Sequence, residues 1–198
     1  MRNLKIFHAY GNNLKGEIPR AIGNLQNTLE ELVLSENDFV GQIPQELNEM
    51  YKLRSFSMHQ TNNKSGGLSG TLPNFANCYA LTTLHLSGNS LSGMLPENFF
   101  ENSDNLKKTI EVDLSSNFLE GPIPKLWRKF SFLNIDLSNN RINHIPDVLC
   151  EKDGWQFEFL GESRNDCNYI LCDVYSIYDV NENECISILS CDHSCKYV

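Results

Sequence analysis

The chain has 198 residues, of which 40% are hydrophobic, and a formal net charge of −9 at pH 7. The charge is uneven, because residues 1–150 hold 13 Lys+Arg against 15 Asp+Glu (net −2) while residues 151–198 hold 3 against 10 (net −7). Acidic surfaces repel phosphate and anionic lipid, and no apolar run approaches the roughly 18–20 residues of a membrane span, so we expect no nucleic-acid partner and no membrane segment within this chain.

Along the chain, one phrase of alternating apolar residues closed by asparagine keeps returning. It begins as "LKIFHAYGNNL" (4–14) and recurs as "LEELVLSENDF" (29–39), "LTTLHLSGNSL" (81–91), "IEVDLSSNFL" (110–119) and "LNIDLSNNRI" (133–142). Such alternation predicts short strands with one buried face. The asparagines of these copies are expected to turn inward and hydrogen-bond the backbone of neighbouring coils, as a ladder formed by Asn12, Asn37, Asn89, Asn117 and Asn140.

A second phrase follows each of these segments. It reads "GEIP" (16–19), "GQIP" (41–44), "GTLP" (70–73), "GMLP" (93–96), "GPIP" (121–124) and, in degenerate form, "NHIP" (143–146). Its glycine predicts a flexible turn, and its proline fixes φ where the chain crosses to the next face. Apolar positions farther on are expected to close the convex side, namely Ile22, Leu25, Leu47, Met50, Phe99, Trp127 and Phe130. The sequence therefore predicts a solenoid of six stacked coils over residues 1–149.

The third copy departs from the pattern. Between Met58 and Leu68 the sequence is longer than in the other copies and lacks the ladder asparagine, which predicts an insertion near residues 59–67 that bulges from the edge. It contains Asn63-Lys64-Ser65, the one N-glycosylation sequon in the sequence, so Asn63 is the candidate glycosylation site. Cys78, in "FANCYAL", is expected to be a small buried thiol on the convex return.

The other six of the seven cysteines lie in the last 49 residues. An even, clustered set predicts a disulfide framework and an oxidising compartment, although the sequence leaves the pairing open among Cys150, Cys167, Cys172, Cys185, Cys191 and Cys195. We therefore expect residues 150–198 to form a small cysteine-rich cap. The alternation in "WQFEFLG" (155–161) predicts one further strand that covers the last coil.

Two metal sites in this tail are weaker alternatives. Cys185, Cys191, His193 and Cys195 offer zinc donors, but the tail has no C-x-x-C pair. The segment "DVNEN" (179–183) begins like a calcium loop, but the sixth and twelfth positions are Glu184 and Ser190 instead of glycine and glutamate. We predict no metal and no cofactor.

The predicted register points one set of side chains outward from the concave face. These candidate ligand-binding residues are Lys5, His8, Tyr10, Glu31, Val33, Arg54, Ser57, His59, Thr83, His85, Glu111, Asp113, Asn134 and Asp136. Coils lie about 5 Å apart, so the three histidines are too dispersed to share one site. The sequence has no recognisable nucleophile motif and no phosphate-binding glycine loop, which predicts a protein that is not an enzyme. An acid/base pair formed by Asp113 and Asp136 is the alternative.

The combined pattern L-x-x-L-x-L-x-x-N-x-L-x-G-x-I-P resembles the plant-type extracellular leucine-rich repeat, in six copies over about residues 4–149. The resemblance implies an α/β-type solenoid with short parallel strands and a 3₁₀ or irregular convex side, followed by the disulfide-rich cap. The tail, with Gly154-Trp155 and then Cys167-Asn-Tyr-Ile-Leu-Cys172, resembles the cysteine-rich C-terminal segments of leucine-rich-repeat proteins of diatoms and related algae. Asp173 stands where that family usually has proline.

This resemblance implies a non-catalytic extracellular or cell-surface module that binds a protein, peptide or glycan on its concave face. Implied roles are a receptor-like ectodomain, an adhesion protein or an inhibitor of cell-wall-degrading enzymes. Leu4, Phe7 and Leu14 resemble interior repeat positions with no N-terminal cap before them, so we expect Met1 to lie inside a longer chain with a signal peptide or anchor upstream. The alternatives are a surface protein cross-linked through its tail, an intracellular scaffold with free thiols and a glycosidase.

Overall fold

The computed structural model describes residues 3–60, 67–104, 107–144 and 146, and the backbone of four short strands farther on. In this part of the chain the largest element is an eight-stranded sheet with the order β1-β3-β6-β8-β10-β12-β14-β15. All neighbours up to β14 pair in parallel, and β15 is antiparallel to β14. The strands are β1 (Ile6–His8), β3 (Glu31–Val33), β6 (Ser55–Ser57), β8 (Thr83–His85), β10 (Thr109–Asp113), β12 (Phe132–Asp136), β14 (Trp155–Glu158) and β15 (Ser163–Arg164).

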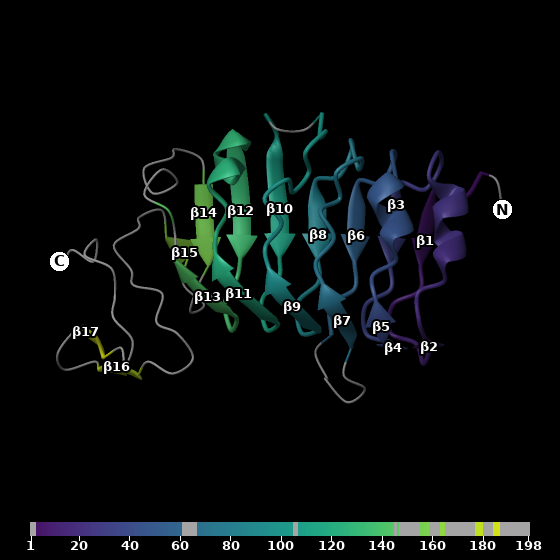
Figure 1. Cartoon of the computed structure of the whole chain (residues 1–198). Helices are drawn as coiled ribbons and strands as arrows, with labels where there is room; N and C mark the ends of the chain where they lie inside the picture. The colour runs from purple at the N-terminus through teal and green to yellow at the C-terminus, as the bar shows by residue number, and fades with distance from the viewer. Residues whose placement is uncertain are drawn as a thin grey trace.

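Figure 1 shows these strands side by side in chain order, as the sequence predicts for a solenoid. β14 falls within the segment whose alternation predicts a further strand, and it pairs with β12, with Leu133 opposite Trp155 and Ile135 opposite Phe157. A two-stranded antiparallel pair, β16 (Ile177–Asp179) and β17 (Glu184–Ile186), lies farther along the chain. The leucine-rich-repeat solenoid predicted from the sequence is confirmed.

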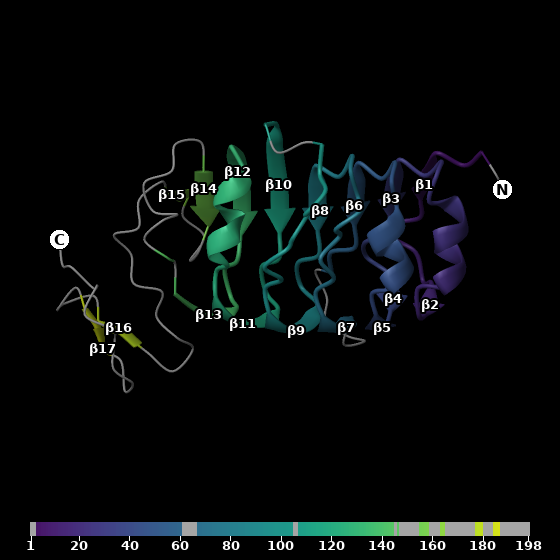
Figure 2. The same cartoon turned by 45° about the horizontal axis from the view of Figure 1, so that its top comes forward.

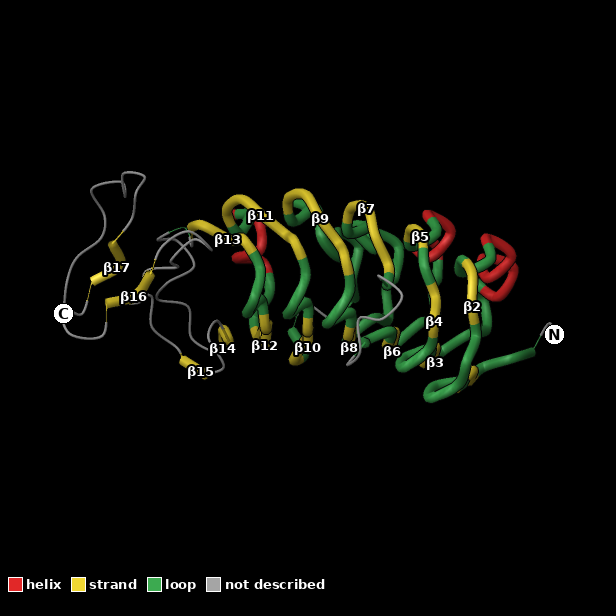
Figure 3. The backbone as a smooth tube through the Cα atoms, turned by 90° about the horizontal axis from the view of Figure 1, so that it is seen from below, coloured by secondary structure: helices red, strands yellow, loops and turns green. Residues whose placement is uncertain are grey.

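A second sheet covers the next side of the coils, in the order β13-β11-β9-β7-β5 (Figure 3). Its strands are β5 (Gly41–Gln42), β7 (Leu68–Thr71), β9 (Ser90–Met94), β11 (Phe118–Pro122) and β13 (Arg141–His144), and the pair β2 (Lys15–Gly16) and β4 (Asp38–Phe39) continues the arrangement. The sequence predicted only flexible turns at the Gly-x-Ile/Leu-Pro phrases. The second sheet was not predicted because its strands are defined by pairing between coils and carry no apolar alternation of their own.

The glycines of this phrase allow close stacking of the second sheet. Gly121 has φ +81°, and a Cβ there would lie 3.1 Å from Cγ of Met94 on the preceding coil. Glycine therefore permits both the left-handed backbone and the close approach of the neighbouring side chain. The last copy has Asn143 at this position, and there the pairing of β11 with β13 shifts between Gly121 and Pro122.

The third side carries short 3₁₀ helices (Figure 2): η1 (Arg20–Leu25), η2 (Gln45–Glu49) and η3 (Lys125–Lys129). Each begins directly after the proline of the repeated phrase, which is extended at Pro19, Pro44 and Pro124. The fixed φ of proline and its missing N–H suit the residue that precedes a helical turn. One coil is thus a strand, a short second strand and a convex turn.

The core runs continuously through the stacked coils. The central residues of the large sheet, such as Leu32, Phe56 and Leu84, have no exposed surface. On the convex side Phe99 stacks on Trp127 with ring centroids 4.9 Å apart, and the Trp127 Nε1–H donates to the Pro96 carbonyl at 2.9 Å. The predicted convex positions Leu47, Met50, Phe99, Trp127 and Phe130 are buried, and Ile22 and Leu25 pack against the core. Each buried side chain of this size stabilises the fold by about 1.5–3 kcal/mol.

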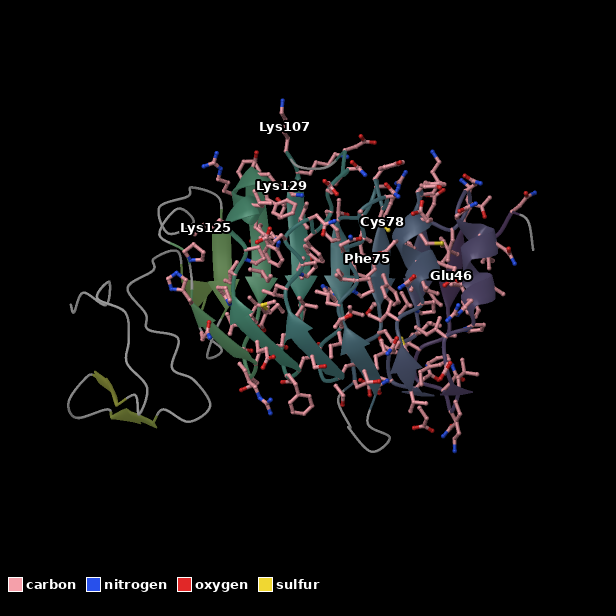
Figure 4. The ribbon with its side chains drawn as sticks, viewed as in Figure 1. Glu46, Phe75, Cys78, Lys107, Lys125 and Lys129 are labelled. Atoms are coloured by element: carbon pink, nitrogen blue, oxygen red, sulfur yellow. The ribbon has the colours of Figure 1, made fainter. Side chains whose placement is uncertain are left out.

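Cys78 lies in this convex layer, close to Phe75 (Figure 4). Its thiol is free and buried, and it donates to the Leu47 carbonyl at 3.0 Å. Burial raises the pKa of Cys78 to about 12, so the thiol stays protonated at neutral pH. The sequence prediction of a small buried thiol is confirmed.

The repeated asparagines join consecutive coils. Asn117 Nδ2 donates to the Leu114 and Ser115 carbonyls of its own coil and to the Leu86 carbonyl of the preceding coil, while its Oδ1 accepts from the Leu91 N–H. Asn37, Asn89 and Asn140 make the equivalent bonds. One side chain therefore satisfies backbone groups that the bend after the strand leaves without partners.

The residue before each ladder asparagine is left-handed. Gly11 and Gly88 have φ +65° and +69°, and the equivalent Glu36, Ser116 and Asn139 have φ between 54° and 55°. A left-handed non-glycine residue costs about 1–2 kcal/mol. The asparagine bonds hold the backbone in this bend, so the ladder and the bend depend on each other.

We predict that Asn117→Ala lowers the free energy of unfolding by about 3 kcal/mol, because it leaves buried carbonyl and N–H groups without partners. Urea unfolding followed by circular dichroism measures the change. The matched control is Asn12→Ala, which removes only two exposed bonds within its own coil and should cost less than about 1 kcal/mol. Equal losses for the two variants would show that the ladder does not connect the coils energetically.

Candidate recognition surface on the strand face

The exposed face of the eight-stranded sheet, here called the strand face, carries the candidate residues in rows. Register places His8, Val33, Ser57, His85, Asp113 and Asp136 in one row across six coils. A parallel row contains Ile6, Glu31, Ser55, Thr83, Glu111 and Asn134. On the other face of the same strands lies the central row, which is buried in the core and consists of Leu32, Phe56, Leu84, Val112 and Ile135. This packing fixes the strand backbone, while the exposed side chains differ from coil to coil.

Two members of these rows were missed from the sequence. Ile6 and Ser55 occupy register positions in the second row, whereas Lys5 and Arg54, which the sequence analysis selected, lie one residue earlier. The first coil matches the repeat loosely, and strand registers defined by leucines alone are uncertain by one residue at the strand start. Ile6 is 53% exposed and Tyr10 is 67% exposed, so the first coil contributes apolar surface.

Lys5 and Arg54 form a charged cluster around a carboxylate from the coil between them. Lys5 Nζ lies 2.9 Å from Glu30 Oε1, and Arg54 Nε lies 3.7 Å from Glu30 Oε2. The hydrogen bond and charge of Lys5 lower the pKa of Glu30, with a smaller contribution from the charge of Arg54. This cluster fixes two long side chains at the start of the strands.

Each of the three strand-face histidines lies beside a glutamate. His8 Nε2 is 2.9 Å from Glu31 Oε2, His85 Nε2 is 3.6 Å from Glu111 Oε1, and His59 Nε2 is 3.8 Å from Glu36 Oε1. The three histidines lie on different coils, and each pairs with a glutamate of a neighbouring coil. In the described part of the chain no group of three or more His, Cys, Asp or Glu residues is arranged to hold a metal ion.

Ser57 is less available than its row suggests, because it is only 8% exposed. Its Oγ lies 2.9 Å from Ser35 Oγ and 3.3 Å from His59 Nδ1, and Ser35 Oγ also accepts from the His59 N–H at 3.2 Å. These bonds join two coils. The serine hydroxyl is thus engaged in the scaffold and is not an open nucleophile.

Asp113 and Asp136 face each other in register across β10 and β12. Asp113 Oδ1 accepts from Ser115 N–H at 3.0 Å and from Ser115 Oγ–H at 2.7 Å, and Asp136 Oδ1 accepts from Ser138 N–H at 2.8 Å. Both carboxylates therefore stabilise the bend that follows their own strand. This local role explains aspartate in the segments "DLSSN" and "DLSNN" without any acid/base chemistry.

The remaining site predictions fall on residues outside the described part. Asn63, the side chains of the zinc and calcium alternatives and the side chains of the proposed disulfide cysteines belong to this group, although the backbone of Asp179, Glu184 and Cys185 is described. Among the described residues no helix is long and apolar enough to cross a membrane.

We predict that a proton titration of Glu30, followed by NMR, gives a midpoint below the ordinary value of 4.5. Because the pKa of Glu30 is lower in the folded state, its ion pair stabilises the fold fully above the ordinary pKa of glutamate. This stabilisation is lost as the pH falls through the lowered pKa. Lys5→Ala should move the midpoint of Glu30 upward. Lys15→Ala is the matched control, because Lys15 pairs with Asp38 at 3.9 Å on β4 and should leave the titration of Glu30 unchanged. If Lys5→Ala left the midpoint of Glu30 unchanged, Lys5 would not be the cause of the lowered pKa.

Comparisons with known proteins agree with this architecture. A family model described as Leucine Rich Repeat matches residues 3–25, 28–50 and 80–102. Receptor-like protein 18 of Arabidopsis thaliana is 35% identical over 147 residues, which cover 72% of this chain and 16% of that protein. Receptor-like protein 39 of the same plant is 40% identical over 149 residues, with 73% and 16% covered. The chain thus spans about a sixth of the length of these relatives.

Solved structures show the same coil. The crystal structure of PEPR1–AtPEP1 superimposes with a TM-score of 0.69 at 28% identity, over 80% of this chain and 21% of that one. The chain is therefore a leucine-rich-repeat solenoid that is similar to plant receptor-like proteins.

Proposed function

We propose that this chain is part of an extracellular or cell-surface recognition module that binds a peptide on the strand face without chemical turnover. The observation that supports this function most directly is the contrast between the two faces of one sheet. From the second coil onward the central row is buried and apolar, while the residues in the exposed rows change between apolar, polar and charged from coil to coil. A rigid surface of this kind loses little conformational entropy when a ligand binds.

The apolar and charged groups on the strand face suit different parts of one ligand. Tyr10 and Ile6 expose apolar area on the first coil, and Lys5, next to Ile6 in the chain, pairs with Glu30, which also pairs with Arg54. Coils five and six present Asp113 and Asp136 instead. An extended peptide crosses successive strands and can place a different side chain over each coil. The PEPR1 structure, which is a complex with AtPEP1, supports a peptide as the ligand class; a protein surface or a glycan is the broader alternative.

The test uses the whole chain and a displayed library of random linear peptides as the probe. Peptides selected for binding should lose at least tenfold in affinity against Tyr10→Ala or His85→Ala, because aromatic and charged contacts at the centre of an interface dominate binding. Lys125→Ala is the matched control, since Lys125 is exposed on η3, and the helices lie on the side of the coils opposite the strand face (Figure 3). Selected peptides that bind both strand-face variants as tightly as the unchanged chain would overturn the proposed surface.

The absence of catalysis is the second part of the proposal. Asp113 and Asp136 accept hydrogen bonds from the turns beside them, so we expect their substitution to weaken the fold modestly. We expect no enzymatic activity that these substitutions could abolish. Incubation with a panel of plant and algal polysaccharides should give no new reducing ends. Turnover that disappears in both Asp113→Asn and Asp136→Asn would replace this part of the proposal with the glycosidase alternative.

We also propose that residues 150–198 are a disulfide-bonded cap and that Asn63 carries glycan. The even number of tail cysteines and the sequon in a polar insertion support this assignment. Peptide mass spectrometry of secreted protein under non-reducing conditions should find all six tail cysteines paired within one chain and a glycan on Asn63. Free tail thiols would favour the intracellular scaffold, and pairs between chains would favour the cross-linked surface protein.

A further inference from the structure

One edge of the solenoid is basic, although the chain as a whole is acidic. The strands from β1 to β12 of the large sheet run in the same direction, so the residues that lead into them gather along one edge (Figure 1). The three residues before each of these six strands include six basic residues and one acidic residue, Glu30. The basic residues, here called the basic edge, are Lys5, Lys52, Arg54, Lys107, Lys108 and Lys129. Figure 4 shows Lys107 pointing outward from this edge.

In the first three coils the cations outnumber the carboxylate between them. Lys5 and Arg54 pair with Glu30 at 2.9 Å and 3.7 Å, and their side chains are 71% and 68% exposed. The hydrogen bond and charge of Lys5 lower the pKa of Glu30, with smaller contributions from the charges of Arg54 and Lys52. One carboxylate is therefore shared by three cations, and positive charge is left over for a ligand.

The cations that lead into β10 are compensated even less. Lys107 and Lys108 are exposed, and within the described residues neither forms an ion pair with a carboxylate. Asp104, an exposed residue, precedes them in the chain. Lys129 is half-buried and lies within the field of Glu101. The positive charge of this part of the edge is thus concentrated at Lys107 and Lys108.

An aromatic pair lies between these two groups of cations. Tyr51, next to Lys52 in the chain, stacks on Tyr79 of the following coil with ring centroids 5.6 Å apart and an angle of 14° between the ring planes. Tyr79 is 36% exposed, and its carbonyl accepts from the Asp104 N–H of the segment that leads to Lys107. Two stacked tyrosines offer a rigid apolar surface with polar hydroxyl groups at its border.

The basic edge is long and narrow. It extends over six coils, which corresponds to about 24 Å at one strand spacing of about 4.8 Å. The strand face beside it carries Glu31, Glu111 and Asp113. A broad anionic partner, such as a membrane or a folded acidic protein, would also meet these carboxylates and be repelled by them. A slender anionic chain can follow the cations without crossing the strand face.

We propose that the basic edge binds a linear acidic polysaccharide whose sugar rings carry carboxylate or sulfate groups. The anionic groups lie against the cations on both sides of the tyrosine pair, and one sugar ring packs the flat face of its C–H groups on Tyr79. The cations alone suit any polyanion, whereas the exposed aromatic ring between them favours a chain of sugars. This surface is separate from the strand face, so the inference goes beyond the proposed function and does not depend on it.

The test measures binding of the full chain to two anionic probes by isothermal titration calorimetry. Oligogalacturonate carries carboxylates and dextran sulfate carries sulfates, and the tighter of the two identifies the anionic group that the edge prefers. Neutral dextran should not bind. Binding of the preferred probe should weaken at least tenfold when the salt concentration is raised about tenfold, because salt screens exposed charges.

Matched variants locate the binding surface. A triple variant removes three exposed cations of the edge, Lys52→Gln, Lys107→Gln and Lys108→Gln, and should lose at least tenfold in affinity. The control makes the same change in net charge at exposed cations of β2 and of the first residues of η1 and η3, as Lys15→Gln, Arg20→Gln and Lys125→Gln. It should change the affinity less than twofold. Unchanged circular dichroism spectra show that both variants remain folded.

Single variants separate a sugar chain from other polyanions. Tyr79→Ala should weaken binding of the preferred polysaccharide at least fivefold, Asp104→Asn should strengthen it, and Tyr10→Ala on the strand face should leave it unchanged. Equal affinities of the two triple variants, or no salt-sensitive binding of either anionic polysaccharide, would overturn the proposal. Poly-L-glutamate that binds more tightly than both polysaccharides, and equally well to Tyr79→Ala, would also overturn it, in favour of an acidic protein.

Discussion

The fold depends on one contact, the parallel stacking of each coil on the coil before it. A single coil contains strands of two to five residues and cannot bury both sides of its apolar row. The neighbour supplies the backbone partners of the strands, the second wall of the core and the carbonyl and amide that the ladder asparagine needs. The stability of the solenoid is therefore approximately the sum of the stabilities of the single coils and of the interfaces between neighbouring coils.

This dependence explains why asparagine and glycine recur together with leucine in most copies of the repeat. The asparagine amide has two donors and an acceptor, which suits a bend that leaves carbonyls and an N–H of two coils without partners. A left-handed residue precedes it in each coil, and Gly88 shows how tight the packing is, because a Cβ there would overlap the Gln60 carbonyl oxygen. Where a coil departs from the pattern, local structure changes with it, as at Asn143 and the shifted register of β11 and β13.

The sequence predicted those parts of the fold that correspond to a recurring pattern of residues. Alternation located the strands of the large sheet, and the periodic apolar residues identified the convex core, including Leu47 and Trp127. The second sheet was missed because its strands are defined by contacts between coils and not by a pattern within one. The exposed rows were mostly located by register, but Ile6 and Ser55 were missed, and the bonds that make Ser57 inaccessible join residues 22 positions apart. Such contacts depend on how the residues of each coil align with those of the next coil, which the repeat pattern alone does not determine.

The same architecture separates structure from recognition on a single strand. In β10, Ile110 and Val112 are buried and Glu111 is exposed. A substitution at Glu111 changes the charge that a ligand meets and leaves the inter-coil hydrogen bonds intact, because those bonds are made by backbone. Asp113 shows the limit of this freedom, since its carboxylate also holds the turn at Ser115. Exposed positions whose side chains bond the following bend, such as Asp113 and Asp136, therefore serve the scaffold first. Ligand specificity is better sought at positions such as Tyr10, Thr83 and Glu111, for which no such bond is seen within the described residues.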